Sequence, residues 1–241
     1  MYQSIVVPLD GSRFSEHALP IAGELARRAG ATLRLVHIHT LSAFPIYAEG
    51  QPVIDENLAS RSHEQEQSYL ERIKAALLTT GETELKLVIE VVDRSLESMV
   101  NEPLGSFLAT YAATTQTDLL VMTTHGRGGV ARFWLGSVAD ALMHLSHVPI
   151  LLVRPSEGAP DLAQPPRFKH ILIPLDGSAL AEKSLEPALA LGDLLGAEYT
   201  LLRIVEPLFP AYNVLARTHE LDEAATQEAW RYLAQVVQRL A

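Results

Sequence analysis

The sequence DLLVMTTHGRGGVARFWLGSVADALMHLSHVPILLV occupies residues Asp118–Val153. Its pattern predicts a buried strand, a loop that contains three glycines, a helix that opens at Gly136-Ser137, and a second buried strand at Val148–Val153. Backbone N–H groups in a loop that leads into a helix N-terminus form an anion site, because the N–H dipoles and the positive end of the helix both face the ligand. The stretch therefore predicts a phosphate site, and a nucleotide as its ligand.

The composition indicates a folded protein with little affinity for nucleic acid. The chain has 241 residues, of which 48% are hydrophobic and 20% are charged, so one large or two small domains with a core are expected. The net charge of −10 repels a nucleic-acid backbone. Cysteine is absent, which excludes disulfides, thiolate nucleophiles and Cys-ligated metals. Neither a signal peptide nor an apolar run of about 20 residues is found, so we expect a cytoplasmic protein without a membrane partner.

The sequence contains an internal repeat. Residues Ile5–Ser12 read IVVPLDGS and residues Ile171–Ser178 read ILIPLDGS, and the offset stays constant through the next helix and strand, where Ile38 matches Ile204. A long match without gaps indicates duplication. The segment between the copies is rich in Pro, Gly and Ala, as linkers are. We therefore predict a first domain over residues 1–155, a linker over 156–167 and a second domain over 168–241.

Strands and helices alternate along the first domain. Such alternation predicts an α/β fold with a doubly wound, five-stranded parallel sheet in the order 3-2-1-4-5. Ligands bind such sheets beyond the carboxyl ends of the first and fourth strands, where Asp10-Gly11-Ser12 and the Thr123–Gly129 loop are expected. A polar loop is expected at residues 41–52. The five strands are predicted at Ser4–Leu9, Thr32–Ile38, Leu85–Val92, Asp118–Met122 and Val148–Val153, and the helices at Ser12–Gly30, Leu58–Leu78, from Pro103 and at Gly136–Leu145.

The second copy matches only the first half of this pattern. Two strands and two helices are predicted at His170–Leu175, Ser178–Leu195, Glu198–Val205 and Glu220–Leu240. Nothing after them matches the later strands or the glycine loop. We expect either a truncated copy or a half-domain completed by contacts with another chain. A homodimer is the other partner that we expect, with the strand Val148–Val153 pairing across a twofold axis.

Several of these motifs together resemble the universal stress protein family. The shared features are the run Pro8–Ser12, the later MTTHGRGG, the dipeptide Gly136-Ser137 and the spacing between them. Nucleotide-binding members of that family carry the pattern G-x-x-G, nine residues, then G-[S/T]. Gly126 and Gly136-Ser137 match it with nine residues between them, whereas Thr123 stands where the pattern has its first glycine. The resemblance covers the whole first domain and the first half of another copy.

The resemblance implies a flavodoxin-like sandwich that binds ATP, or ADP or AMP, with any Mg²⁺ arriving on the triphosphate. Glycines in the loop permit a close approach of the backbone, and Arg127 supplies a cation to the phosphates. Thr123 either narrows the site with its Cβ or donates its hydroxyl. The implied adenosine contacts are Pro8, Asp10 and Ile38, and the implied phosphate contacts are Thr123, His125, Gly126, Arg127, Gly128, Gly129, Gly136, Ser137 and Val138.

These features favour a regulatory or sensor protein of the stress response that hydrolyses ATP weakly at most. The Walker A lysine pattern is absent, and His125 has no nucleophile and supporting acid beside it in the sequence, so no catalytic residue is assigned. Two alternatives stay open, a slow adenine-nucleotide hydrolase and an interaction module that does not bind nucleotide. Asp10 is alternatively a residue that only forms the turn before Ser12. For Asp176, the matching residue of the second copy, this turn role is the favoured interpretation. His37 and His39 alternate on one strand, but no further ligand can be named, so no metal site is predicted.

Overall fold

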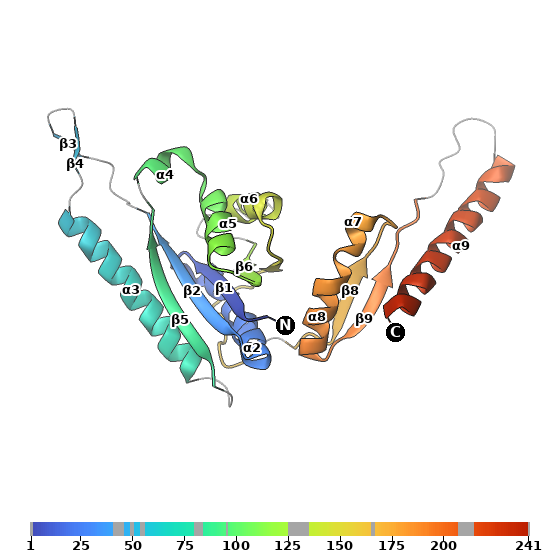
Figure 1. Cartoon of the computed structure of the whole chain (residues 1–241), viewed down its shortest axis with the longest axis horizontal. Coiled ribbons are helices and arrows are strands. Elements are labelled where there is room, and N and C mark those ends of the chain that lie inside the picture. Colours follow the sequence, from blue (N-terminus) through green and yellow to red (C-terminus); the bar gives the residue numbers. More distant parts are fainter. Residues whose placement is uncertain are drawn as a thin grey trace. The chain divides into compact units, whose positions relative to one another are not determined.

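The computed structural model describes residues 2–40, 46–48, 51–53, 56–79, 84–94, 96–124, 135–164, 167–206 and 215–240 (Figure 1). It divides the chain into two compact units, Met1–Pro166 and Arg167–Ala241.

A five-stranded parallel sheet forms the centre of the first unit. Its strands lie in the order β5-β2-β1-β6-β7, which is 3-2-1-4-5 in chain order and confirms the predicted doubly wound α/β fold. Strand β1 therefore lies between β2 and β6, at the point where the strand order reverses. The five strands are β1 (Ser4–Leu9), β2 (Thr32–His39), β5 (Lys86–Asp93), β6 (Leu119–Thr123) and β7 (Ile150–Val153).

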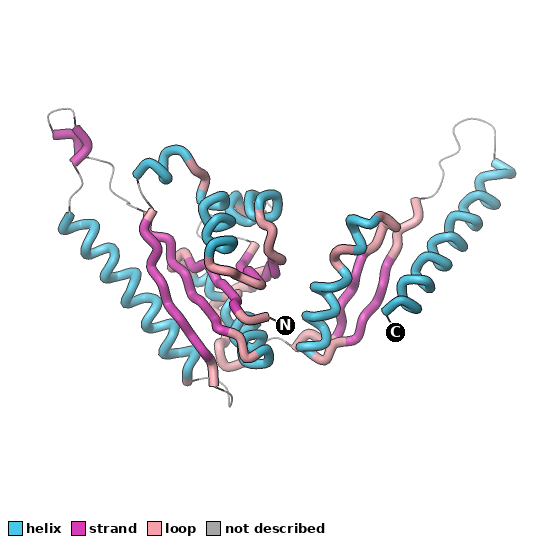
Figure 2. The backbone as a smooth tube through the Cα atoms, viewed as in Figure 1, coloured by secondary structure: helices cyan, strands magenta, loops and turns pink. Residues whose placement is uncertain are grey.

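Helices cover both faces of this sheet (Figure 2). On one face lie α2 (Leu19–Ala29) and α3 (Glu56–Leu78), which Arg27 joins by donating from Nη2 to the Leu77 carbonyl at 2.8 Å. On the other face, α5 (Leu104–Thr114) and α6 (Ser137–Leu145) pack against alternate strand residues. The buried residues of this second layer are Val6, Val36, Ile38, Leu108, Tyr111, Ala112, Leu120, Met122, Ala139 and Leu142.

The segment after β1 forms two helices where one was predicted. The first is the short α1 (Arg13–Glu16), which Ser12 caps by accepting from the Ser15 amide, and the second is α2. Pro20 lies in the first turn of α2, where its missing N–H removes no helical hydrogen bond. Gly30 ends α2 with φ at 64°, a left-handed conformation that glycine adopts without strain.

Two short features of the first unit escaped the sequence analysis. Within the expected loop at residues 41–52, strands β3 (Ile46–Ala48) and β4 (Gln51–Val53) pair antiparallel, so the loop prediction is wrong for these residues. Helix α4 (Leu96–Asn101) precedes α5 and was not expected. Both features are too short to produce a hydrophobic period, and backbone pairing rather than side-chain pattern defines the two strands.

The second unit repeats the first half of the first unit. Its elements are β8 (His170–Pro174), α7 (Ala179–Glu182), α8 (Leu185–Leu195), β9 (Glu198–Leu202) and α9 (Leu215–Leu240). Strands β8 and β9 pair in parallel, and His170 faces Glu198 in the register where Ser4 faces Thr32. The duplication read from the sequence is therefore also a structural repeat, and this copy is partial.

Among the described residues of the second unit, helices lie on one face of the β8–β9 pair. Residues of α8 and α9, among them Leu185 and Val236, pack with Ile173 into a small core. Leu172 and Ile204 belong to the opposite face and are 56% and 79% exposed, respectively. Their counterparts Val6 and Ile38 lie in the core beneath α5 and α6.

No helix in the parts of the chain that the structure describes is both long and apolar enough to cross a bilayer.

We predict that Gly105→Ala destabilises the first unit. A Cβ at Gly105 would lie 2.5 Å from the Ala141 Cβ and 3.1 Å from the Val138 carbonyl oxygen, so α5 and α6 would have to move apart. The expected loss in the free energy of unfolding is about 1–3 kcal/mol, as for overpacked cores. Urea denaturation followed by circular dichroism measures it.

The control is Gly23→Ala in α2. A Cβ there would lie 3.5 Å from the Arg27 Nη1 and 3.9 Å from the Leu77 Cδ2, which are ordinary contacts. Alanine favours helix over glycine by up to about 1 kcal/mol, so this variant should match or exceed the wild type in stability. Equal stability of Gly105→Ala and the wild type would show that α5 and α6 do not approach as described.

Candidate functional site

The candidate site lies where β1 and β6 end. These strands are parallel neighbours, with Ile5 facing Leu119 and Val6 facing Leu120, so their carboxyl ends open onto one edge of the sheet. Asp10 follows the end of β1, and β6 ends at Thr123. The sheet therefore brings Asp10 and Thr123 to the same edge, at the position where such folds bind ligands.

Asp10 sits in a tight turn that leads into α1. Its Oδ1 accepts hydrogen bonds from the Ser12 amide at 2.9 Å and from the Ser12 hydroxyl at 2.6 Å. Gly11 permits the turn with φ at 77°. The turn role that the sequence analysis kept open for Asp10 is thus present in the structure. A carboxylate fixed in this way is also a preorganised acceptor, because little side-chain freedom remains to be lost on binding.

The second unit contains the same turn. Asp176 Oδ1 accepts from the Ser178 amide at 2.7 Å, and Gly177 has φ at 91°. Hydrogen bonds from the hydroxyl and the amide of Ser178 lower the pKa of the Asp176 carboxyl below its usual value. The turn geometry therefore belongs to the shared sequence PLDGS, and any difference in binding between the two units must come from what lies opposite the turn.

Opposite the Asp10 turn, α6 begins at the sheet edge. Its N-cap residue Gly136 is extended, with φ at −73° and ψ at 155°, and donates its N–H to the Thr124 carbonyl at 2.7 Å. Gly136 has no side chain with which to cap this helix. The amides of its first turn, in Ser137 and Val138, therefore have no side-chain acceptor at the N-cap and carry the positive end of the helix dipole.

The three residues predicted for the adenosine end come to one edge of the sheet. Leu9 faces His37 in the register of β1 and β2, so Asp10 and Ile38 follow as the next residues of adjacent segments. Pro8 faces Val36 one step earlier. The Ile38 side chain is buried in the core beneath α5 and α6. Its role at the adenosine end stays a prediction.

Thr123 occupies the position where the family pattern has glycine. It is the last residue of β6, faces Val153 of β7, and is 6% exposed. Its role in binding stays a prediction. The same holds for the loop residues His125, Gly126, Arg127, Gly128 and Gly129, which lie outside the described residues.

A family model described as the universal stress protein family matches residues 1–154 and 167–240. The chain belongs to the universal stress protein family. A universal stress protein of Thermus aquaticus is 30% identical over 154 residues, which cover 64% of this chain and 100% of the relative. The family model follows the internal repeat, because it matches once in each unit.

Solved universal stress proteins share the fold. A putative universal stress protein from Pseudomonas aeruginosa has a TM-score of 0.55 at 14% identity and covers 96% of this chain and 70% of its own. A universal stress protein solved in complex with cAMP is 25% identical, has a TM-score of 0.42, and covers 64% of this chain and 98% of its own. The cAMP complex is a property of that protein.

The sequence of this universal stress protein revealed only part of a second group of polar residues. His37 and His39 alternate on β2, as the sequence analysis noted without finding a further ligand. The structure adds Glu66 and His63 from α3, one helical turn apart and close to His39. Only the packing of α3 on the sheet brings these residues together, so no pattern within one segment could have shown the group.

Proposed function

We propose that the first unit binds an adenine nucleotide at the edge where β1 and β6 end, and acts as a cytoplasmic regulatory or sensor module in the stress response. The observation that carries the proposal is the parallel pairing of β1 with β6. It places the Asp10 turn at the edge where α6 begins with the glycine N-cap Gly136. Membership of the universal stress protein family and the spacing of Gly126 and Gly136-Ser137 support the same ligand.

The proposed ligand is ATP, with ADP or AMP as alternatives. Asp10 accepts a hydrogen bond from the ribose or base, beside Pro8 and Ile38. The phosphates lie against the first-turn amides of Ser137 and Val138, where the helix dipole favours negative charge. The glycines at 126, 128 and 129 and the cation of Arg127 complete the phosphate contacts, and Mg²⁺ enters with the triphosphate.

We propose a binding protein with weak hydrolysis at most. Fast turnover would need a group that positions and activates water at the terminal phosphate. The Asp10 carboxylate already accepts two hydrogen bonds within its turn, which suits a positioning role better than a base. Regulation would then follow from differential binding of nucleotides rather than from rapid turnover.

We predict that Asp10→Ala weakens ATP binding about 10- to 100-fold, because a hydrogen bond to a charged acceptor contributes about 1.5–3 kcal/mol. Isothermal titration calorimetry on the full chain measures the dissociation constant. The matched control is Asp176→Ala, which removes the same turn contact in the second unit. This variant should bind ATP like the wild type.

Two results would contradict the proposal. The first is a wild-type chain that shows no heat of binding with ATP, ADP or AMP at millimolar concentration. The second is an equal loss of affinity for ATP in Asp10→Ala and Asp176→Ala. Binding would then not depend specifically on the Asp10 turn of the first unit.

The bare face of the second unit favours a further role in self-association. In the first unit α5 and α6 cover Val6, which is 0% exposed, whereas its counterpart Leu172 is 56% exposed. Leu202 and Ile204 extend this apolar face with 37% and 79% exposure. We propose that the same face of a second copy covers it, giving a homodimer related by a twofold axis in which each half-domain completes the other.

We predict that the wild-type chain is a dimer and that Leu172→Glu is a monomer, because a carboxylate in the centre of the apolar contact would be buried without a partner. Light scattering coupled to size-exclusion chromatography gives both masses. Leu78→Glu is the control, since Leu78 is 50% exposed at the end of α3 in the first unit. This variant should remain dimeric, and a wild-type monomer at all concentrations would overturn the assembly without affecting the nucleotide site.

A further inference from the structure

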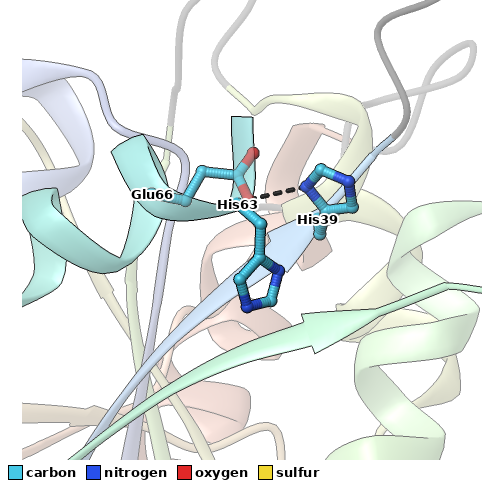
Figure 3. Close-up of side chains that lie close together, drawn as sticks. All are labelled: His39, His63 and Glu66. Carbon is cyan, nitrogen blue, oxygen red and sulfur yellow. Dashed lines mark hydrogen bonds and ion pairs between the residues drawn. The ribbon is translucent and has the colours of Figure 1, made fainter. Parts of the chain in front are cut away.

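Three side chains capable of holding a metal meet between α3 and the end of β2 (Figure 3). They are His39, the last residue of β2, and His63 and Glu66 of α3. One ligand atom from each lies within 4.8 Å of the other two. His39 Nδ1 and Glu66 Oε2 are already 2.7 Å apart.

We propose that His39, His63 and Glu66 bind a divalent transition-metal ion, with Zn²⁺ as the ion they suit best. Two imidazoles and one carboxylate form a common zinc ligand set, and water fills the fourth position of such sites. Ligand atoms at about 2.0–2.1 Å from a tetrahedral zinc lie about 3.3 Å from each other. His39 Nδ1 and Glu66 Oε2 are closer than this, at 2.7 Å, and the three ligand atoms lie within 4.8 Å of one another. That pair must therefore open slightly, and the third ligand must make a short inward movement. His63 can supply it, because its side chain is 45% exposed and has room to rotate.

Neighbouring residues already orient the ligands. His37 Nε2 lies 3.5 Å from Glu66 Oε1, the oxygen that does not contact His39. Asp93, which faces His39 in the register of β2 and β5, has its Oδ1 3.7 Å from His63 Nδ1. Outer partners of this kind fix the ring orientation and the basicity of metal ligands. Asp93 is also placed to act as the partner that holds His63 toward the ion.

Burial distinguishes the three ligands. The side chains of His39 and Glu66 are 7% and 16% exposed, so this pair forms a rigid base beneath α3. A purely structural hydrogen bond between β2 and α3 would explain this pair, but it would not require His63, one helical turn earlier, to approach both of them. The convergence of the third residue is what points to an ion.

The site is independent of the nucleotide proposal. His37 and His39 face α3, whereas Ile38 between them faces α5 and α6, so the two sites use opposite faces of β2. The second unit has no equivalent, because the positions that match His37 and His39 are Arg203 and Val205. The proposal therefore predicts one ion per chain.

The test uses the full chain without an affinity tag, stripped of metal and titrated with Zn²⁺ against a chromophoric chelator. The wild type should bind one Zn²⁺ per chain, and Co²⁺ in its place should give the intense visible absorption of a tetrahedral site. His63→Ala keeps the His39–Glu66 pair and hence the packing of α3. The affinity of this variant for Zn²⁺ should fall further than the roughly 10–100-fold that is lost when an outer partner of a metal ligand is removed.

Two further variants make the result specific. His170→Ala removes an exposed histidine that lies 4.0 Å from Glu198 in the second unit, and it should bind Zn²⁺ like the wild type. His63→Asp restores a ligand atom and should recover part of the affinity. Circular dichroism confirms that each variant is folded.

The proposal is overturned if the wild type binds no stoichiometric Zn²⁺ below millimolar concentration. It is also overturned if His63→Ala and His170→Ala have equal effects, because binding would then reflect any surface histidine.

Discussion

The position of β1 between β2 and β6 is the constraint on which the rest of this structure depends. Parallel pairing on both sides fixes β1 in the sheet, and it forces the chain to leave β1 and β6 at one edge. The Asp10 turn and the start of α6 meet there only for that reason. The pairing of β1 with β2 in turn sets the place of His39, one strand away and on the opposite face from α6. One arrangement of strands thus organises both proposed sites.

The duplication separates what the local sequence determines from what the complete fold adds. Both copies of PLDGS form the same turn, with aspartate accepting from serine and glycine at positive φ. In the first unit β6 and α6 lie across from this turn, whereas the second unit has no counterpart of either among its described residues. Helices α5 and α6 also decide burial, since they cover Val6 in the first unit, whereas its counterpart Leu172 is 56% exposed. A shared motif therefore does not imply a shared site.

The sequence predicted the parts of the fold that leave a local signature. Apolar runs located the five strands, Ser12 and Gly30 marked the limits of the first helical segment, and the repeat identified the second unit. Helix α4 and strands β3 and β4 were missed because each is shorter than the window over which a period becomes visible. For the candidate site, the edge of the sheet was predictable from strand order. The approach of His63 and Glu66 to His39 was not, because it depends on how α3 packs across β2.

The central claim is that a nucleotide is held between the Asp10 turn and the first turn of α6. Backbone amide NMR spectra of the full chain, recorded with and without ATP, test it at the level of single residues. The account predicts that the amides of Gly11, Ser12 and Ser137 shift on addition of ATP, whereas those of Gly177 and Ser178, in the same turn of the second unit, stay in place. Equal shifts in the two turns, or an unchanged first turn of α6, would contradict it.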